Sequence, residues 1–196
     1  FLQLSICLTE LLDLALQLPM QMRPLDGNRR IARKSAKEVD IRVGDRFTCD
    51  VIVRENTEGM YLARGKGVGN DEAMADTMLI TRKGTERIVR HAFEVARTRN
   101  GSPADGVKRV TCVDKSNVLA SMAFFRRVFD EVAEEYPDIK HEYLYSDAAA
   151  QALVVQPQHF DVLVMENFLG DMLSDLGGGT IGGIGLCPSG NIGHDY

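Results

Sequence analysis

The segment GDMLSD at residues 170–175 contains two aspartates, Asp171 and Asp175, four positions apart. On a helix this spacing brings both carboxylates to one face, with Cβ atoms about 5–6 Å apart. A cation bound between them relieves their repulsion, and ligands made only of oxygen favour Mg²⁺ or Mn²⁺ over zinc. The same pair also suits the start of a helix, where the helix dipole stabilises acidic side chains. Taken alone, the spacing leaves both interpretations open.

Four further polar side chains follow apolar segments that are typical of strands. Ligands of open α/β sheets bind beyond the carboxyl ends of the strands. An arginine there can grip a substrate carboxylate with two hydrogen bonds, a tyrosine can donate a proton, and a lysine can act as a base or contact an anion. Each residue by itself also suits a solvated loop or, for the aspartate, the first turn of a helix. The four residues are Arg54, Tyr61, Lys115 and Asp147.

The composition is that of a globular protein of one or two domains, with 196 residues, 44% hydrophobic, 26% charged, and a formal net charge of -5. The basic residues 29–34 are soon followed by acidic ones, so we expect no nucleic-acid-binding face. The leucine-rich residues 1–22 are interrupted by two acids and Pro19. This interruption favours an amphipathic helix over a targeting or membrane segment.

The cysteines and histidines show no ligand spacing. Cys49 and Cys112 lie in apolar runs, which indicates buried, reduced thiols and therefore a reducing, cytoplasmic location. The glycines of residues 65–69 lack the spacing of a phosphate-binding loop, and we expect a flexible loop there.

Hydrophobic periodicity predicts strands that alternate with helices, which indicates an α/β fold with helices packed on a sheet. Residues 78–80 are expected to form a strand of a projecting hairpin, and Ser116 and Ser146 are expected to cap two helices. The predicted strands are 47–53, 109–113, 142–145 and 160–165; the predicted helices are 4–18, 85–98, 116–136, 146–155 and a short one from about 170.

Five blocks, taken together, resemble the isocitrate/isopropylmalate dehydrogenase family, especially its isopropylmalate- and tartrate-dehydrogenase-like members. Their order and separations match that family from about residue 8 to residue 193, which is more specific than any single block. The blocks are VIVRENTEGMY (51–61), VDKSNVL (113–119), YSDAAAQALV (145–154), ENFLGDMLSD (166–175) and GLCPSGNIG (185–193).

The resemblance implies an isopropylmalate-dehydrogenase-like fold that oxidises and decarboxylates a small 2-hydroxy diacid of the malate, tartrate, isopropylmalate or isocitrate type. It implies Mg²⁺ or Mn²⁺ and NAD, with NADP as an alternative. It further implies a homodimer in which Lys115 and Asp147 reach the site from the second subunit. The implied roles are substrate binding for Arg23, Arg54 and Asn117, proton transfer for Tyr61 and Lys115, metal binding for Asp147, Asp171 and Asp175, and cofactor contact for Asn117 and Asn191.

The implied organisation is a smaller substrate, metal and dimerisation domain at residues 16–181. Residues 1–15 and 182–196 would be remnants of an incomplete large dinucleotide-binding domain. The family's opening strand and glycine-rich turn have no counterpart, so we expect a chain truncated at both ends that binds Mn²⁺ weakly and turns over poorly or not at all alone. Thr9 stands where the family carries an arginine, which leaves the substrate's identity open.

Two alternatives remain at this stage. The chain could be a catalytically inactive or regulatory subunit that pairs with a complete homologue and lends it Lys115 and Asp147. It could also be a metal-dependent decarboxylase that releases CO₂ from a 3-carboxy-2-keto acid without any nicotinamide.

Overall fold

The computed structural model describes residues 2–5, 50–183, 185, 187 and 189–192. Within this part a six-stranded sheet has the strand order β6-β5-β7-β2-β1-β8, and a separate hairpin pairs β3 with β4. Strands β6, β5, β7 and β2 run parallel, whereas β1 is antiparallel to both of its neighbours. The sheet strands are β1 (Leu2–Ser5), β2 (Val51–Glu55), β5 (Arg109–Asp114), β6 (Lys140–Tyr145), β7 (Val162–Met165) and β8 (Ser189–Ile192).

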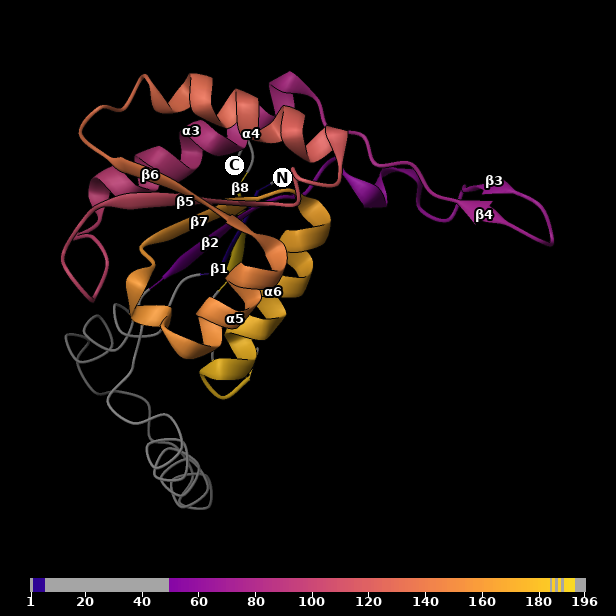
Figure 1. Ribbon diagram of the computed structural model, residues 1–196. Helices are drawn as coiled ribbons and strands as arrows, with labels where there is room; N and C mark the ends of the chain where they lie inside the picture. Colours follow the sequence, from indigo (N-terminus) through magenta and orange to yellow (C-terminus); the bar gives the residue numbers. More distant parts are fainter. Residues whose placement is uncertain (1, 6–49, 184, 186, 188, 193–196) are drawn as a thin grey trace, which may run out of the picture.

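Helices cover both faces of this sheet, with α3 and α4 on one side and α5 and α6 on the other (Figure 1). The predicted α/β layered fold is therefore confirmed. The helices are α3 (Arg82–Thr98), α4 (Ala120–Ala133), α5 (Ser146–Val155) and α6 (Asn167–Thr180), with short 3-10 helices η1 (Met60–Ala63) and η2 (Pro157–His159).

The central strands are apolar on both faces because each face is covered by helices. In β2, Val51 and Val53 pack into the core beneath α3 and α4, while Ile52 between them packs on the opposite side. In β7, Val164 and Leu163 divide in the same way. This alternation follows from the two-residue period of a strand, and it leaves the polar residues for the strand ends.

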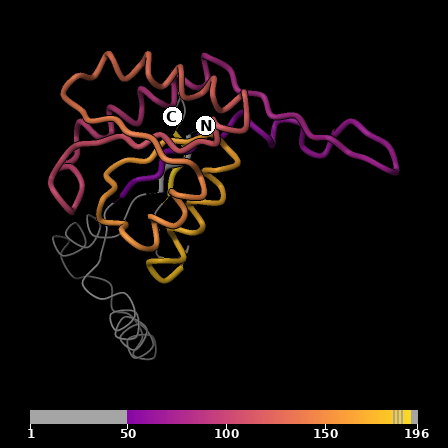
Figure 2. The backbone as a smooth tube through the Cα atoms, in the orientation of Figure 1, coloured from indigo at the N-terminus to yellow at the C-terminus, as the bar shows by residue number. Residues whose placement is uncertain are grey.

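The segment before α3 forms a hairpin, β3 (Val68–Gly69) and β4 (Met74–Ala75), that extends away from the sheet (Figure 2). The projecting arm is confirmed, but its strands precede the expected residues 78–80. Leu79 instead forms an isolated antiparallel bridge with Gly59 at the base of the arm. The turn is fixed by Asn70, whose Oδ1 accepts hydrogen bonds from the backbone N–H groups of Glu72 and Ala73, a local turn device. Of the flexible loop expected at residues 65–69, Val68–Gly69 is the strand β3.

The predicted amphipathic helix at the start of the chain is wrong at its first turn. Leu2–Ser5 is a strand, β1, paired with β2 on one side and β8 on the other. Leucine spacing favoured a helix, but the hydrogen bonds that hold β1 join residues more than 40 positions apart and leave no local signature. The remainder of the predicted helix lies outside the described residues.

The predicted starts of α4 and α6 and the predicted cap of α5 need correction. Helix α4 begins at Ala120, not at Ser116, because the backbone turns after β5 with the Ser116 N–H donating to Asp114 Oδ1 at 2.8 Å. Helix α5 begins at Ser146 as predicted, but the N-cap position is Tyr145 and not Ser146. Helix α6 begins at Asn167 and is longer than expected. Its cap is Glu166, whose carboxylate accepts the N–H groups of the second and third residues that follow it.

None of the helices in the described part of the chain combines the length and the apolar character needed to cross a membrane.

The aromatic cluster beneath α3 and α4 provides a direct test of the packing. Phe93 is fully buried and stacks on Tyr136, with ring centroids 4.8 Å apart. We expect Phe93→Ala to lower the free energy of unfolding by about 3–5 kcal/mol, because it removes buried surface and leaves a cavity. The measurement is urea denaturation. Lys83→Ala, at an exposed position of the same helix, should change it by no more than about 0.5 kcal/mol. Equal effects of the two variants would contradict this packing.

Candidate active site

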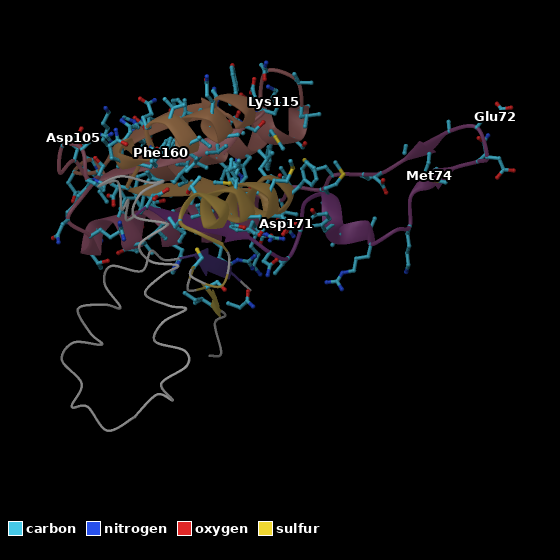
Figure 3. All side chains as sticks on the ribbon, turned by 90° about the horizontal axis from the view of Figure 1, so that it is seen from below. Glu72, Met74, Asp105, Lys115, Phe160 and Asp171 are labelled. Atoms are coloured by element: carbon cyan, nitrogen blue, oxygen red, sulfur yellow. The ribbon has the colours of Figure 1, made fainter. Side chains whose placement is uncertain are left out.

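The carboxyl ends of the four parallel strands lie at one edge of the sheet, and several of the predicted site residues follow these strand ends. Arg54 is the last residue but one of β2, and Lys115 directly follows β5. Asp147 lies in the first turn of α5, after β6. Asp171 lies in α6, which follows β7. Figure 3 shows Lys115 and Asp171 on the side from which the hairpin projects, while Asp105 lies at the opposite end.

Arg54 is held by two side chains of α6. Its Nε and Nη2 donate to Asn167 Oδ1 at 3.1 and 2.7 Å, and its Nη1 donates to Asp171 Oδ1 at 2.5 Å. Its stem lies against Gly170, where an added Cβ would come within 2.4 Å of the Arg54 Cγ. Only 8% of the residue is exposed. A buried guanidinium with this many oxygen partners has a fixed orientation.

Tyr61 contacts the second oxygen of the same carboxylate. The tyrosine lies in η1, and its hydroxyl donates to Asp171 Oδ2 at 2.9 Å. Its ring contacts Phe168 edge-on, with centroids 5.9 Å apart. The hydrogen bond to the Asp171 carboxylate raises the pKa of Tyr61 above its ordinary value, so the phenol keeps its proton at neutral pH. Arg54, Tyr61 and Asp171 therefore form one cluster with a proton donor and a cation around one anion.

The two aspartates of α6 have the chemistry of a partial cation site. Asp171 is 45% exposed at its side chain, and Asp175 lies one turn later on an exposed position. Carboxylate oxygens on one helix face fit a hard divalent cation. Across the described residues, however, no three His, Cys, Asp or Glu side chains of one chain come together in a way that could hold a metal.

Lys115 and Asp147 form a second cluster at the same edge. Lys115 Nζ donates to Asp147 Oδ1 at 2.6 Å and lies 5.7 Å from the centre of the Tyr145 ring. The hydrogen bond from Lys115 lowers the pKa of Asp147. Among the described residues, Asp147 does not come together with Asp171 and Asp175 in a group of three that could hold a metal ion. Within one chain the two clusters are separate.

A buried ion pair supports the Lys115 turn. Asp114 is 1% exposed, and its carboxylate accepts Nε and Nη2 of Arg126 at 2.7 and 3.0 Å. The same carboxylate accepts the Ser116 N–H. Arg126 in turn lies over the rings of Tyr143 and Tyr145. The backbone that carries Lys115 is thereby tied to β6 and the start of α5.

Three other residues were predicted to belong to the site. Asn117 is exposed in the turn between β5 and α4. Asn191 lies in β8, where its Oδ1 accepts a hydrogen bond from Asn56 Nδ2 at 3.3 Å. Arg23 lies outside the described residues.

Sequence reasoning missed three acidic and amide side chains that build the site. Asn167 orients Arg54 and also donates from Nδ2 to the carbonyl oxygen of Glu58 at 2.9 Å. Glu55 is 1% exposed and accepts the N–H groups of Thr57 and Glu58, which fixes the turn after β2. Glu166 caps α6. The only sequence signal for them was a run of polar residues directly after two apolar strands.

The family model of isocitrate/isopropylmalate dehydrogenase matches residues 16–196. The chain belongs to this family. The 3-isopropylmalate/3-methylmalate dehydrogenase of Methanocaldococcus jannaschii is 48% identical over 148 residues, which are 74% of this chain and 43% of that protein. The 3-isopropylmalate dehydrogenase of Listeria monocytogenes is 43% identical over 175 residues, covering 89% of this chain and 47% of that protein.

Solved structures agree with this assignment. The isocitrate dehydrogenase from Methylococcus capsulatus has a TM-score of 0.69 and 43% identity, and the match covers 78% of this chain and 44% of that one. The TT0538 protein from Thermus thermophilus has the same TM-score at 33% identity, with 98% and 32% covered. The chain therefore spans less than half the length of these relatives.

The Tyr61–Asp171 contact predicts a measurable pKa change. The carboxylate stabilises the protonated phenol, so Asp171→Asn should lower the pKa of Tyr61 towards its ordinary value, and phenolate should appear at lower pH than in the wild type. The measurement is phenolate absorbance during an alkaline titration. Subtracting the Tyr61→Phe curve in each background isolates this one tyrosine among the five. An unchanged or higher pKa in Asp171→Asn would contradict the contact.

Proposed function

We propose that the protein containing this chain is a metal- and NAD(P)-dependent dehydrogenase that oxidises and decarboxylates a small 2-hydroxy diacid. The observation that carries the proposal is the convergence of Arg54 and Tyr61 on the carboxylate of Asp171. An anion-binding guanidinium, a protonated phenol and a potential cation ligand thus lie within one hydrogen-bonded cluster. Membership of the family and the names of its 3-isopropylmalate dehydrogenase relatives support the same reaction.

The side chains of the two clusters have distinct tasks in the proposed reaction. When bound, a divalent cation supplies positive charge that stabilises the hydroxyl oxygen as it loses its proton, and NAD(P)⁺ supplies the hydride acceptor. Arg54 binds a carboxylate of the diacid and fixes its orientation. Lys115 accepts the hydroxyl proton. When the carbon–carbon bond to the departing carboxylate breaks, its electron pair forms an enolate, and Tyr61 returns a proton to the carbon.

A complete site in this proposal takes residues from two copies of the chain. Asp171 and Asp175 of one copy would bind the cation together with Asp147 of a second copy, whose Lys115 would enter beside it. What supports this arrangement is that Asp147, Asp171 and Asp175 do not come together as a three-ligand group in the described part of one chain. The hairpin of β3 and β4, which projects beyond the body of the chain, would belong to the dimer contact (Figure 2).

The remaining assignments complete the proposed site. Arg23 and Asn117 would bind substrate, and Asn117 and Asn191 would contact the nicotinamide cofactor. Residues 16–181 would form the substrate, metal and dimerisation domain. The flanking residues would belong to a dinucleotide-binding domain, with β1 and β8 continuing the sheet of the first domain beside β2.

Turnover tests the reaction itself. With the product of the full reading frame that contains these residues, we expect Mn²⁺-dependent NADH or NADPH formation, read at 340 nm, from at least one of malate, tartrate, isopropylmalate and isocitrate. Asp175→Ala removes a proposed cation ligand and should lower kcat/KM by about 100-fold or more. Exposed Lys83→Ala serves as the control. Oxaloacetate decarboxylation without any nicotinamide reduction would contradict the dehydrogenase and favour a simple decarboxylase.

Mixing two inactive variants tests the sharing of the site. Lys115→Gln and Asp175→Ala damage opposite halves of each proposed site, so a mixed dimer carries one intact site and one doubly altered site. After statistical reassociation we expect roughly a quarter of the wild-type activity from two preparations that are each inactive. A mixture that stays inactive, although mass spectrometry shows mixed dimers, would place both residues in sites built from a single chain.

A further inference from the structure

Asn167 binds Arg54 more extensively than the proposed metal ligand does. One amide oxygen accepts both Nε and Nη2 of the guanidinium, whereas Asp171 takes only Nη1. Nε and Nη2 lie on the side edge of the guanidinium plane, so this contact fixes the direction in which the plane points. Asn167 itself is 4% exposed at the first position of α6.

The orientation of the Asn167 amide is set from its other end. Its Nδ2 donates to the carbonyl oxygen of Glu58 at 2.9 Å. A flipped amide would turn its NH₂ group towards the guanidinium and its oxygen towards a carbonyl, which loses all three bonds. Glu58 in turn accepts the N–H and hydroxyl of Thr81 at the start of α3. The amide therefore links Arg54 to a rigid part of the fold.

Asp171 cannot hold Arg54 in the same way throughout the proposed reaction. If the Asp171 carboxylate binds a divalent cation, that cation repels the nearby guanidinium. It also competes for the carboxylate oxygen that Arg54 Nη1 now contacts. The Asn167 amide carries no net charge, so it neither attracts the cation nor neutralises the positive charge that Arg54 offers to a substrate. A neutral acceptor suits a bond that must persist when the cation arrives.

We propose that Asn167 is a positioning residue that holds the Arg54 guanidinium independently of Asp171. Asp171 is then free to exchange its contact with Arg54 for a divalent cation while Arg54 keeps its orientation towards an anionic substrate. Gly170 contributes by leaving room for the Arg54 stem, because an added Cβ would come within 2.4 Å of Cγ. This inference rests on the proposed function for the roles of Asp171 and the substrate.

The test is the Nε–H resonance of Arg54 in ¹⁵N-labelled protein, assigned by its loss in Arg54→Lys and followed during titration with Mg²⁺ alone. In the wild type we expect the resonance to remain visible and slow to exchange with water before and after Mg²⁺ binds. In Asn167→Ala we expect Mg²⁺ to speed its exchange by about 10-fold or more. Ser174→Ala removes another side-chain bond of α6, from Ser174 Oγ to the backbone oxygen of Asp171, and should behave like the wild type.

Two results would overturn the proposal: loss of the resonance in wild-type protein when Mg²⁺ binds, or its persistence in Asn167→Ala. Where Asn167→Ala does not fold, Asn167→Ser provides the same comparison with a shorter side chain.

Calorimetry of malate and isopropylmalate binding in the presence of Mg²⁺ tests the proposed function separately from the positioning by Asn167. If the wild type binds neither diacid while the resonance behaves as expected, the proposed function fails and the positioning by Asn167 stands. We expect Asn167→Ala to weaken diacid binding about 10- to 100-fold, and to have no further effect in an Arg54→Lys background.

Discussion

The arrangement of the site depends on one buried guanidinium, that of Arg54, at the end of a parallel strand. Arg54 emerges from β2 with 8% of its surface exposed, and a guanidinium taken out of water must find oxygen partners or destabilise the fold. Those partners come from the first turns of α6, which starts where the neighbouring strand β7 ends. The need to satisfy Arg54 therefore fixes how α6 approaches β2, and with it the positions of Asp171 and Asp175.

The burial of the Arg54 side chain also explains features of α6 and its cap. Gly170 is required because the Arg54 stem crosses α6 at that position. Glu166 caps α6 at the strand end, and burial raises its pKa above the ordinary value despite the two backbone N–H bonds. The carboxyl edge of the sheet thus brings together several buried charged groups, Arg54, Glu55 and Glu166. Lys115 and Asp147 form a more exposed pair at the same edge, and the buried Asp114 supports their turn through Arg126.

The sequence allowed the architecture and the chemical residue types to be predicted. The apolar runs of β2, β5 and β7 and the helical spacing of apolar residues in α3 are visible in the sequence. The family resemblance rested on five blocks that include Arg54, Lys115 and Asp171. The remainder depended on contacts between distant segments. Strand β1 is held by pairing with β2 and β8, which the leucine spacing of the first residues could not indicate. Asn167 was overlooked because its three hydrogen bonds go to two residues, Arg54 and Glu58, that lie more than 100 positions away in sequence.

The central claim is that two copies of this chain complete one cation site between them. Anomalous diffraction from crystals soaked in Mn²⁺ tests it most directly. The account predicts one anomalous peak per chain, about 2.0–2.2 Å from carboxylate oxygens of Asp171 and Asp175 of one copy and of Asp147 of a second copy, with the other positions filled by water or a diacid. A peak bound within a single chain, or one at α6 with Asp147 of every copy far away, would contradict the account.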